Sequence, residues 1–301
     1  WSSWMSELVP KRIRGRYFGR RTALCMLGGA LTAAATGCVI DHTPSDQARG
    51  VVLASLQIVG CAAGLVTTAL MLRQHDPRPE RVLVELSWAR ILQPLRDPAP
   101  RGFLIYLASW NTAMGLAGSY FSLHMLRNLK LGFTLIALHS TALAVVRMVA
   151  APGWGRTLDR LGARPVLLAC SFGISAVPFI WLFPRQDCLW PLAIDVVVTG
   201  VLSSGHSLAM FNLPLALAPR AQRPFYLAAF STVAGLAYSL ATLAGGLLTQ
   251  ALPDETQWVG YTLRDLQLVF VLSGLLRLAA AFTAFGIREH AARDLGALWT
   301  V

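Results

Sequence analysis

Long apolar runs alternate with short polar connectors along this chain. Each of eight runs is long enough to cross a bilayer as a helix, which takes roughly 20 mainly apolar residues. The runs lie at about 22–40, 51–72, 103–126, 131–152, 166–184, 190–212, 225–251 and 266–286, and the residues before Pro10 resemble the end of another. Because lipid offers no partners for free backbone N–H and C=O groups, every run is predicted to be a helix. The pattern therefore predicts an all-α, polytopic transmembrane helical bundle with about eight full spans and a partial N-terminal helix.

Composition and charge support this prediction and set the orientation. Of the 301 residues, 55% are hydrophobic and 14% are charged, whereas about 25% are charged in soluble domains. The net charge of +11 would indicate a nucleic-acid partner in a soluble protein, but here it follows topology. When connectors are assigned alternately to the two sides of the membrane, one side receives 19 of the 26 Lys and Arg residues and the other receives five. Lys and Arg collect on the cytoplasmic side, so the C-terminus is predicted to be cytoplasmic and no nucleic-acid partner is expected.

The connector Gly153–Arg164 carries the most specific motif, GWGRTLDRLGAR. Its glycines permit a tight turn and a close helix approach. Asp159 is able to accept hydrogen bonds from the first amides of a neighbouring helix, where the helix dipole favours an anion. The segment resembles the cytoplasmic loop signature of the major facilitator superfamily of secondary transporters, with Ala163 standing where a basic residue is common. The matching and flanking positions are Gly155, Arg156, Leu158, Asp159, Arg160, Gly162 and Arg164.

A second segment resembles another feature of this superfamily. Pro10, Arg14, Gly15 and Arg16 match the pattern Pro-x-x-x-Arg-Gly-Arg, which members often carry after the fourth helix. The resemblance implies that both segments form a cytoplasmic gate, in which Asp159 faces the start of the helix after Arg20 and latches two helical halves in the outward-open state. The alternatives are a solvated basic connector for the first segment and a positively charged membrane anchor for the second.

A short internal repeat indicates how the chain is divided. Leu8–Arg21 resembles Leu217–Phe230 at an offset of 209 residues, and superfamily members consist of two six-helix halves. We therefore expect residues 1–72 to be the end of an N-terminal half and residues 103–287 to be the C-terminal half. Residues 73–102 are expected to be a cytoplasmic linker with an amphipathic helix at 80–97, and 288–301 a cytoplasmic tail. On this interpretation the chain is an N-terminally truncated fragment.

Together these features predict a secondary active transporter that moves a small solute by alternating access with ion coupling. The resemblance is to bacterial members, so the expected location is the bacterial inner membrane. The expected partners are a small-molecule substrate, protons and the lipid bilayer; a monomer, no cofactor and no metal site are expected. The sequence contains no GxxxxGK[ST], HExxH or GxSxG motif, and no enzyme activity is predicted. The alternative is a non-transporting membrane sensor or assembly factor with the same architecture.

Polar residues inside the predicted spans are the candidates for a substrate or proton pathway, because polar groups are costly in a membrane. They are Asn111, Tyr120, His139, Arg147, Asp195, His206 and Asn212. Arg147 is either a cavity-lining cation for an anionic substrate or a side chain that reaches back to the interface. Asp195 is either a protonation site or a hydrated cap, and each histidine either couples protons or packs through hydrogen bonds. Arg277 also lies within a span and has no assigned role.

Overall fold

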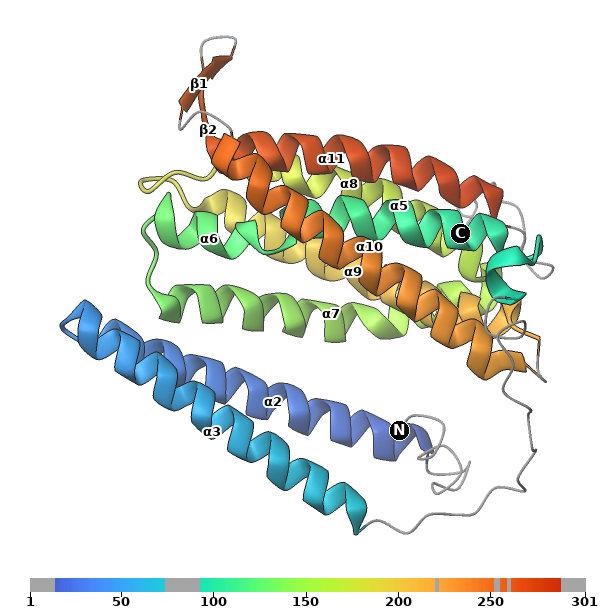
Figure 1. Ribbon diagram of the computed structural model, residues 1–301, viewed down its shortest axis with the longest axis horizontal. Coiled ribbons are helices and arrows are strands. Elements are labelled where there is room, and N and C mark those ends of the chain that lie inside the picture. The colour runs from blue at the N-terminus through green and yellow to red at the C-terminus, as the bar shows by residue number, and fades with distance from the viewer. Residues whose placement is uncertain (1–13, 74–92, 220–221, 252–254, 259–260, 288–301) are drawn as a thin grey trace. The chain divides into compact units, whose positions relative to one another are not determined.

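The computed structural model describes residues 14–73, 93–219, 222–251, 255–258 and 261–287 (Figure 1). Pro10, most of the predicted linker helix at 80–97 and the predicted tail at 288–301 lie outside the described residues. The elements are α2 (Arg14–Asp41), α3 (Asp46–Leu72), α5 (Arg101–Gly118), α6 (Tyr120–Arg127), α7 (Phe133–Leu161), α8 (Ala163–Ile180), α9 (Trp190–Leu217), α10 (Arg223–Ala251), β1 (Glu255–Trp258), β2 (Tyr261–Arg264), α11 (Asp265–Thr283) and a 3-10 turn at Ala284–Gly286.

Helices form at all eight apolar runs, which confirms the all-α prediction. Six of the described helices are long and apolar enough to cross a membrane. The run at 103–126 forms two consecutive helices, α5 and α6, which are separated at Ser119. Several helices extend beyond their apolar runs: α2 already begins at Arg14, and α7 continues to Leu161. Apolar composition thus located the helices but not their ends.

The expected turn at Gly153–Arg164 is much shorter than the sequence indicated. Residues 153–161 belong to α7, and α8 begins at Ala163. Only Gly162 lies between the two helices, with a φ of 92°. Residues with a side chain rarely adopt this left-handed backbone conformation, whereas glycine does so without a steric penalty. The motif is therefore the last two turns of one helix, joined to the next helix through a single glycine.

A small antiparallel hairpin connects α10 to α11 and was not predicted. Its strands β1 and β2 pair from Glu255 opposite Arg264 to Trp258 opposite Tyr261. Each strand has only four residues, too few to give a clear alternation of apolar and polar positions. The hairpin is a local addition to an otherwise helical chain.

The contacts between Cα atoms divide the chain into two compact units, one of residues 1–85 and 131–141 and the other of residues 86–130 and 142–301. In the first unit α2 packs against α3, and Ser45 caps the start of α3 by accepting a hydrogen bond from the Ala48 amide at 3.2 Å. In the second unit α5 packs against α10 and α11, while α8 packs against α9 and α11 (Figure 1).

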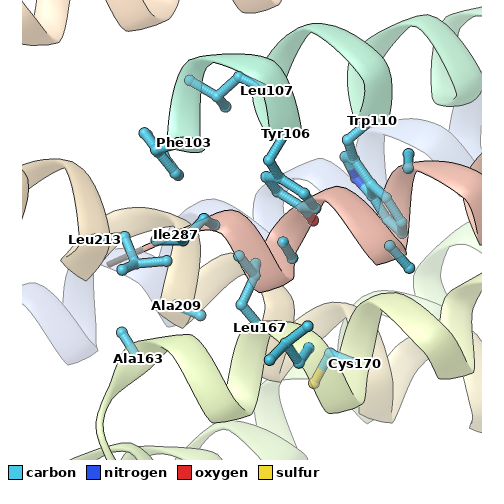
Figure 2. Close-up of a cluster of buried hydrophobic side chains, with 14 of the residues drawn as sticks. Phe103, Tyr106, Leu107, Trp110, Ala163, Leu167, Cys170, Ala209, Leu213 and Ile287 are labelled. Carbon is cyan, nitrogen blue, oxygen red and sulfur yellow. The ribbon is translucent and has the colours of Figure 1, made fainter. Parts of the chain in front are cut away.

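The apolar core of the second unit lies where α5, α8, α9 and α11 meet (Figure 2). Phe103, Tyr106 and Trp110 project into it from α5, as Figure 2 shows, and Tyr226 joins it from α10. The other members include Val166, Leu167, Cys170, Ala209, Leu213, Phe230, Ala280 and Ala281. This core holds the helices that carry most of the candidate site residues.

Glycines bring α5 and α10 into backbone contact. A Cβ atom at Gly115 of α5 would overlap the carbonyl oxygen of Tyr238, and one at Gly245 of α10 would overlap the carbonyl oxygen of Leu116. The close approach lets the Thr242 hydroxyl donate to the Gly115 carbonyl oxygen at 3.0 Å. Small residues serve this purpose in membrane helices, where packing rather than the hydrophobic effect drives association.

We predict that Gly115→Ala destabilises the protein by about 1–3 kcal/mol, because the added methyl group forces α5 and α10 apart. The measurement is the thermal midpoint of the purified full-length protein in detergent. Gly235→Ala is the matched control, since Gly235 lies within the partner helix α10 and a Cβ there meets no atom within 4 Å. The control is expected to be neutral or stabilising by up to about 1 kcal/mol through helix propensity. Equal midpoints for the two variants would contradict the packing interpretation.

Candidate functional site

Arg147 of α7 lies against α9. The guanidinium Nη2 atom of this half-buried residue donates to the Ser207 hydroxyl at 3.0 Å. Two turns further along α7, the Trp154 indole donates to the Val201 carbonyl oxygen at 2.9 Å. The Trp154 ring also fills the space beside Gly205, where a Cβ would lie 2.6 Å from it. These contacts fix the register of α7 and α9 and hold the Arg147 side chain beside Ser207.

A hydrogen-bonded network lies next to Ser207. The Tyr106 hydroxyl of α5 is 2.8 Å from the Ser171 hydroxyl of α8 and 2.8 Å from Nε2 of His206 on α9. The Trp110 ring stacks on the His206 ring with centroids 4.9 Å apart. Tyr106 is fully buried, and Figure 2 shows it pointing from α5 toward the layer of Cys170 and Leu167. A buried hydroxyl group needs partners, and here two other helices supply them.

Arg147 and His206 belong to one site. Ser207, which binds Arg147, follows His206 directly in α9, and the Arg147 charge acts electrostatically on the His206 ring. Four helices, α5, α7, α8 and α9, therefore place a cation, an imidazole and three hydroxyl groups around one turn of α9. Such a group offers hydrogen bonds and positive charge to an anion, and the hydroxyl–imidazole chain is able to pass a proton. We refer to Tyr106, Arg147, Ser171, His206 and Ser207 as the α9 cluster.

Sequence reasoning identified Arg147 and His206 but not Tyr106 or Ser171. A lone tyrosine in an apolar run is ordinarily a packing residue, and serine is common in membrane helices. One available signal was that Tyr106 precedes Trp110 by four residues, so the two aromatic rings share a helix face. Its significance became visible only when α8 and α9 placed polar side chains opposite that face.

Asp195 pairs with a different helix. Its buried carboxylate accepts a hydrogen bond from Thr199 at 2.7 Å and acts electrostatically on Arg277 of α11. Both residues are only 2% exposed, and the Arg277 guanidinium lies 5.7 Å from the centre of the Phe121 ring. Arg277 thus has a structural account that the sequence did not provide, as a buried cation beside an internal carboxylate and an aromatic face.

The remaining candidates are not brought into the α9 cluster. The side-chain amides of Asn111 and Asn212 each donate to a carbonyl oxygen one turn earlier in their own helix. The Tyr120 hydroxyl donates to the Thr242 carbonyl oxygen at 3.2 Å, which joins α6 to α10. His139 belongs to the first compact unit, together with residues 131–141.

The predicted gate residues occupy helix ends. Asp159, Arg156 and Arg160 are exposed in the last turns of α7. Arg164, in the first turn of α8, donates to the Phe285 carbonyl oxygen at 2.9 Å and so binds the start of α8 to the chain that follows α11. Among the described residues, Arg14, Gly15 and Arg16 open α2, but their side chains are not described.

The internal repeat also falls at helix starts. Arg14 and Arg223, which align at the offset of 209 residues, are the first residues of α2 and α10. In the second copy, Tyr226 donates a hydrogen bond of 2.5 Å to Asp97, which belongs to the end of the predicted linker. Arg223 donates to the Leu215 carbonyl oxygen at 3.2 Å and so supports the end of α9.

Comparisons with known proteins concern the family and the fold of the chain. A family model described as Major Facilitator Superfamily matches residues 102–298. The human protein "Major facilitator superfamily domain-containing protein 10" is 29% identical over 157 residues, which cover 50% of this chain and 33% of that protein. The match therefore spans about a third of this relative's length. A solved structure described as "Structure of a bacterial metal transporter" aligns with a TM-score of 0.63 and 16% identity, covering 93% of this chain and 67% of that one. At this identity the likeness concerns the fold alone.

We predict that Tyr106→Phe lowers the free energy of unfolding by about 1–2 kcal/mol, because His206 and Ser171 both lose a buried partner. Ser171→Ala should cost less, and the double variant should cost less than the sum of the two single variants, since they share one hydrogen bond. Thermal unfolding of the four proteins in detergent measures this coupling. Tyr238→Phe, at a partly exposed position of α10, is the control and should change stability by less than about 0.5 kcal/mol. Strict additivity would show that Tyr106 and Ser171 do not interact.

Proposed function

The chain belongs to the Major Facilitator Superfamily, and from this premise we propose that it is part of a secondary active transporter, which moves a small solute by alternating access between two helical halves. It is an integral membrane protein by its family and its apolar helices. Ion coupling, with the proton as the ion, is part of the proposal. Members of such folds bind their substrates near the middle of the bilayer and expose the site to each side in turn.

The observation that carries the proposal is the α9 cluster, a group of polar and charged side chains from four apolar helices. Polar and charged side chains inside a membrane protein are costly unless they line a pathway or pair with one another. Arg147 is half-buried, and in the described part of the chain its hydrogen-bond partner is the neutral Ser207 hydroxyl. We therefore propose a solute that carries a negative charge, with a carboxylate as the simplest such group, because its oxygens match the donors of a guanidinium group.

His206 is the proposed proton carrier. Its Nε2 atom shares a hydrogen bond with Tyr106, and Tyr106 shares another with Ser171. A neutral imidazole accepts a proton near physiological pH, and nearby charge changes alter that tendency. An anion bound at Arg147 would offset the positive charge of the guanidinium group near His206, and so favour protonation of the His206 ring. This coupling of anion and proton is the physical basis that we propose for symport.

The remaining parts of the proposal follow the predicted division of the chain. Residues 1–72 and 103–287 would belong to opposite halves, and the connector at Asp159 would lie on the cytoplasmic side together with the C-terminus. The bacterial inner membrane is the proposed location, and the protein is proposed to have no enzyme activity. The metal that the solved bacterial neighbour transports is a property of that protein and is not part of this proposal. The described residues contain no group of three His, Cys, Asp or Glu side chains that could hold a metal ion, and the proposed substrate is an organic anion.

We predict that Arg147→Gln reduces transport of an anionic solute by roughly 100-fold, because it removes the proposed charged hydrogen bond to the solute, worth up to about 3 kcal/mol. The full-length protein is reconstituted in liposomes and screened by counterflow with a panel of small labelled carboxylates. Arg147→Lys should retain part of the activity, since it keeps the charge without the planar fork. Arg185→Gln, at an exposed connector position, is the control. No uptake of any panel member above empty liposomes, or equal uptake by Arg147→Gln, would contradict the proposal.

We predict that Asp159→Asn lowers the transport rate by roughly 2- to 30-fold while membrane insertion stays intact, because the proposed contact of the Asp159 carboxylate with the start of α2 contributes up to about 2 kcal/mol. The rate is measured by the same counterflow assay, and insertion by the yield of folded protein in the membrane fraction. Asp187→Asn, an exposed carboxylate in the connector between α8 and α9, serves as the control. Unchanged transport in Asp159→Asn would favour the alternative of a solvated basic connector.

A further inference from the structure

Helix α7 begins without a capping side chain of its own. The residue before it is Gly132, whose carbonyl oxygen accepts the first helical hydrogen bond from the Ile136 amide at 3.2 Å. Residues at this position ordinarily supply a side-chain oxygen to the first free amides of the helix. Glycine has none, so the amides of Phe133 and Thr134 need a partner from elsewhere.

Asp41, the last residue of α2, supplies both hydrogen bonds. Its Oδ1 atom accepts from the Phe133 amide at 2.8 Å, and its Oδ2 atom accepts from the Thr134 amide at 2.9 Å. The carboxylate also lies at the positive end of the α7 dipole, where a negative charge is stabilised. One helix therefore caps another helix whose sequence position is 92 residues away.

The surrounding residues fit this contact closely. A Cβ at Gly132 would lie 2.7 Å from Oδ2 of Asp41, and a Cβ at Gly37 would lie 3.0 Å from the backbone of Phe133 and Thr134. The Thr134 hydroxyl donates to the Cys38 sulfur at 3.8 Å. Side chains at either glycine would keep the carboxylate from reaching the amides, so the contact depends on the absence of a Cβ on both helices.

The carboxylate stays charged at neutral pH. Asp41 lies just beyond the apolar run at 22–40, and burial alone would raise its pKa. The hydrogen bonds from Thr134 and Phe133 and the nearby His42 outweigh burial and lower the pKa of Asp41 from its ordinary value of 3.8. A lowered carboxyl pKa means that the contact is fully present above about pH 4 and is lost only on stronger acidification. Protonation in the physiological range therefore does not break the contact.

We propose that Asp41 and the first amides of α7 form an external latch, which holds α2 and α7 together on the outer side of the membrane until the transport site opens outward. The proposal rests on the proposed transport function. The connectors at 42–45 and 128–132 lie on the side with few Lys and Arg residues, which is the predicted outer side. The predicted division assigns α2 and α7 to opposite halves, so their separation at this end accompanies outward opening.

The latch has a reciprocal counterpart in the proposed cytoplasmic gate. α2 runs outward and α7 runs inward in the predicted topology, so the end of each helix lies on the same side as the start of the other. Asp41 ends α2 and binds the start of α7, whereas Asp159, in the last turn of α7, is proposed to face the start of α2. In this proposal the same two helices carry one carboxylate–amide contact on each side of the membrane. Breaking the outer contact while forming the cytoplasmic one would open the outer side and close the cytoplasmic side at little net cost in free energy.

Cys38 offers a direct test. The Thr134 hydroxyl oxygen lies 3.8 Å from the Cys38 sulfur, so Thr134→Cys places a second thiol next to the native one. In the full-length protein with all other cysteines replaced by serine, we predict that mild oxidation joins Cys38 to the new cysteine and that reduction reverses the link. Ser140→Cys, about 9 Å further along α7 at the helical rise, is the matched control and should not form a disulfide with Cys38. An equal yield for both pairs, or no link at position 134, would overturn the proposal.

The role of Asp41 is tested separately by accessibility. In this experiment Cys38 is replaced by serine, and Thr134→Cys is the single thiol. Asp41→Ala should then raise the rate at which a membrane-impermeant maleimide labels position 134 from outside by about 2- to 30-fold. This factor corresponds to the free energy that a helix cap contributes. Asp187→Ala, in another connector on the predicted outer side, should leave the rate unchanged. A purely structural role would lower the thermal midpoint of Asp41→Ala without changing the labelling rate, and that result would overturn the latch.

These measurements need no substrate, so they separate the latch from the proposed function. Labelling from the cytoplasmic side alone would overturn the latch, even if counterflow succeeded. Counterflow that fails while the disulfide and the labelling change appear would leave a conformational contact in a protein that does not transport the tested anions. When the protein transports an anion and also forms the latch, the disulfide between Cys38 and position 134 should block counterflow, and reduction should restore counterflow.

Discussion

The amides at the start of a helix and the carbonyl groups at its end have no partners within that helix, and a membrane supplies none. In this chain other helices supply them. Asp41 of α2 binds the first amides of α7, Arg164 of α8 binds the Phe285 carbonyl oxygen beyond α11, and Arg223 of α10 binds the Leu215 carbonyl oxygen near the end of α9. The specific joints of the fold are therefore at helix ends, while the apolar middles pack through small residues such as Gly115. A structure joined in this way is able to exchange end contacts without repacking its core.

The positions and order of the helices could be predicted, because the helix is the one local structure that satisfies the backbone of a single segment inside a membrane, and each apolar run then locates a helical segment. The ends could not be predicted in the same way. Gly153 and Gly155 favour a turn by propensity, yet α7 continues through them because Gly162 alone provides the reversal. The hairpin of β1 and β2 is held by pairing between two short segments, and no period within either segment indicates it.

The sequence predicted single residues of the candidate site but not which residues contact one another. Arg147 and His206 were found because polar groups inside spans are uncommon and costly. The partners Tyr106 and Ser171 come from α5 and α8, and their roles depend on the rotation of those helices, which the sequence pattern does not determine. The role of Asp41 was not predicted for a related reason: Gly132 cannot cap the Phe133 and Thr134 amides, and the residue that does belongs to a helix that is distant in sequence.

The two intramembrane arginines of the second unit explain why we propose the α9 cluster, rather than the Asp195 pair, as the place for a solute. Asp195 and His206 are eleven residues apart in α9, so they share a helix face about 16 Å apart along the axis. At the first position Arg277 already has a buried carboxylate and an aromatic ring beside it. At the second position Arg147 has a neutral hydroxyl and a neutral phenol–imidazole chain nearby. A solute anion at Arg277 would have to displace an internal carboxylate, whereas at Arg147 it would supply the negative charge that the described part of the chain does not place there.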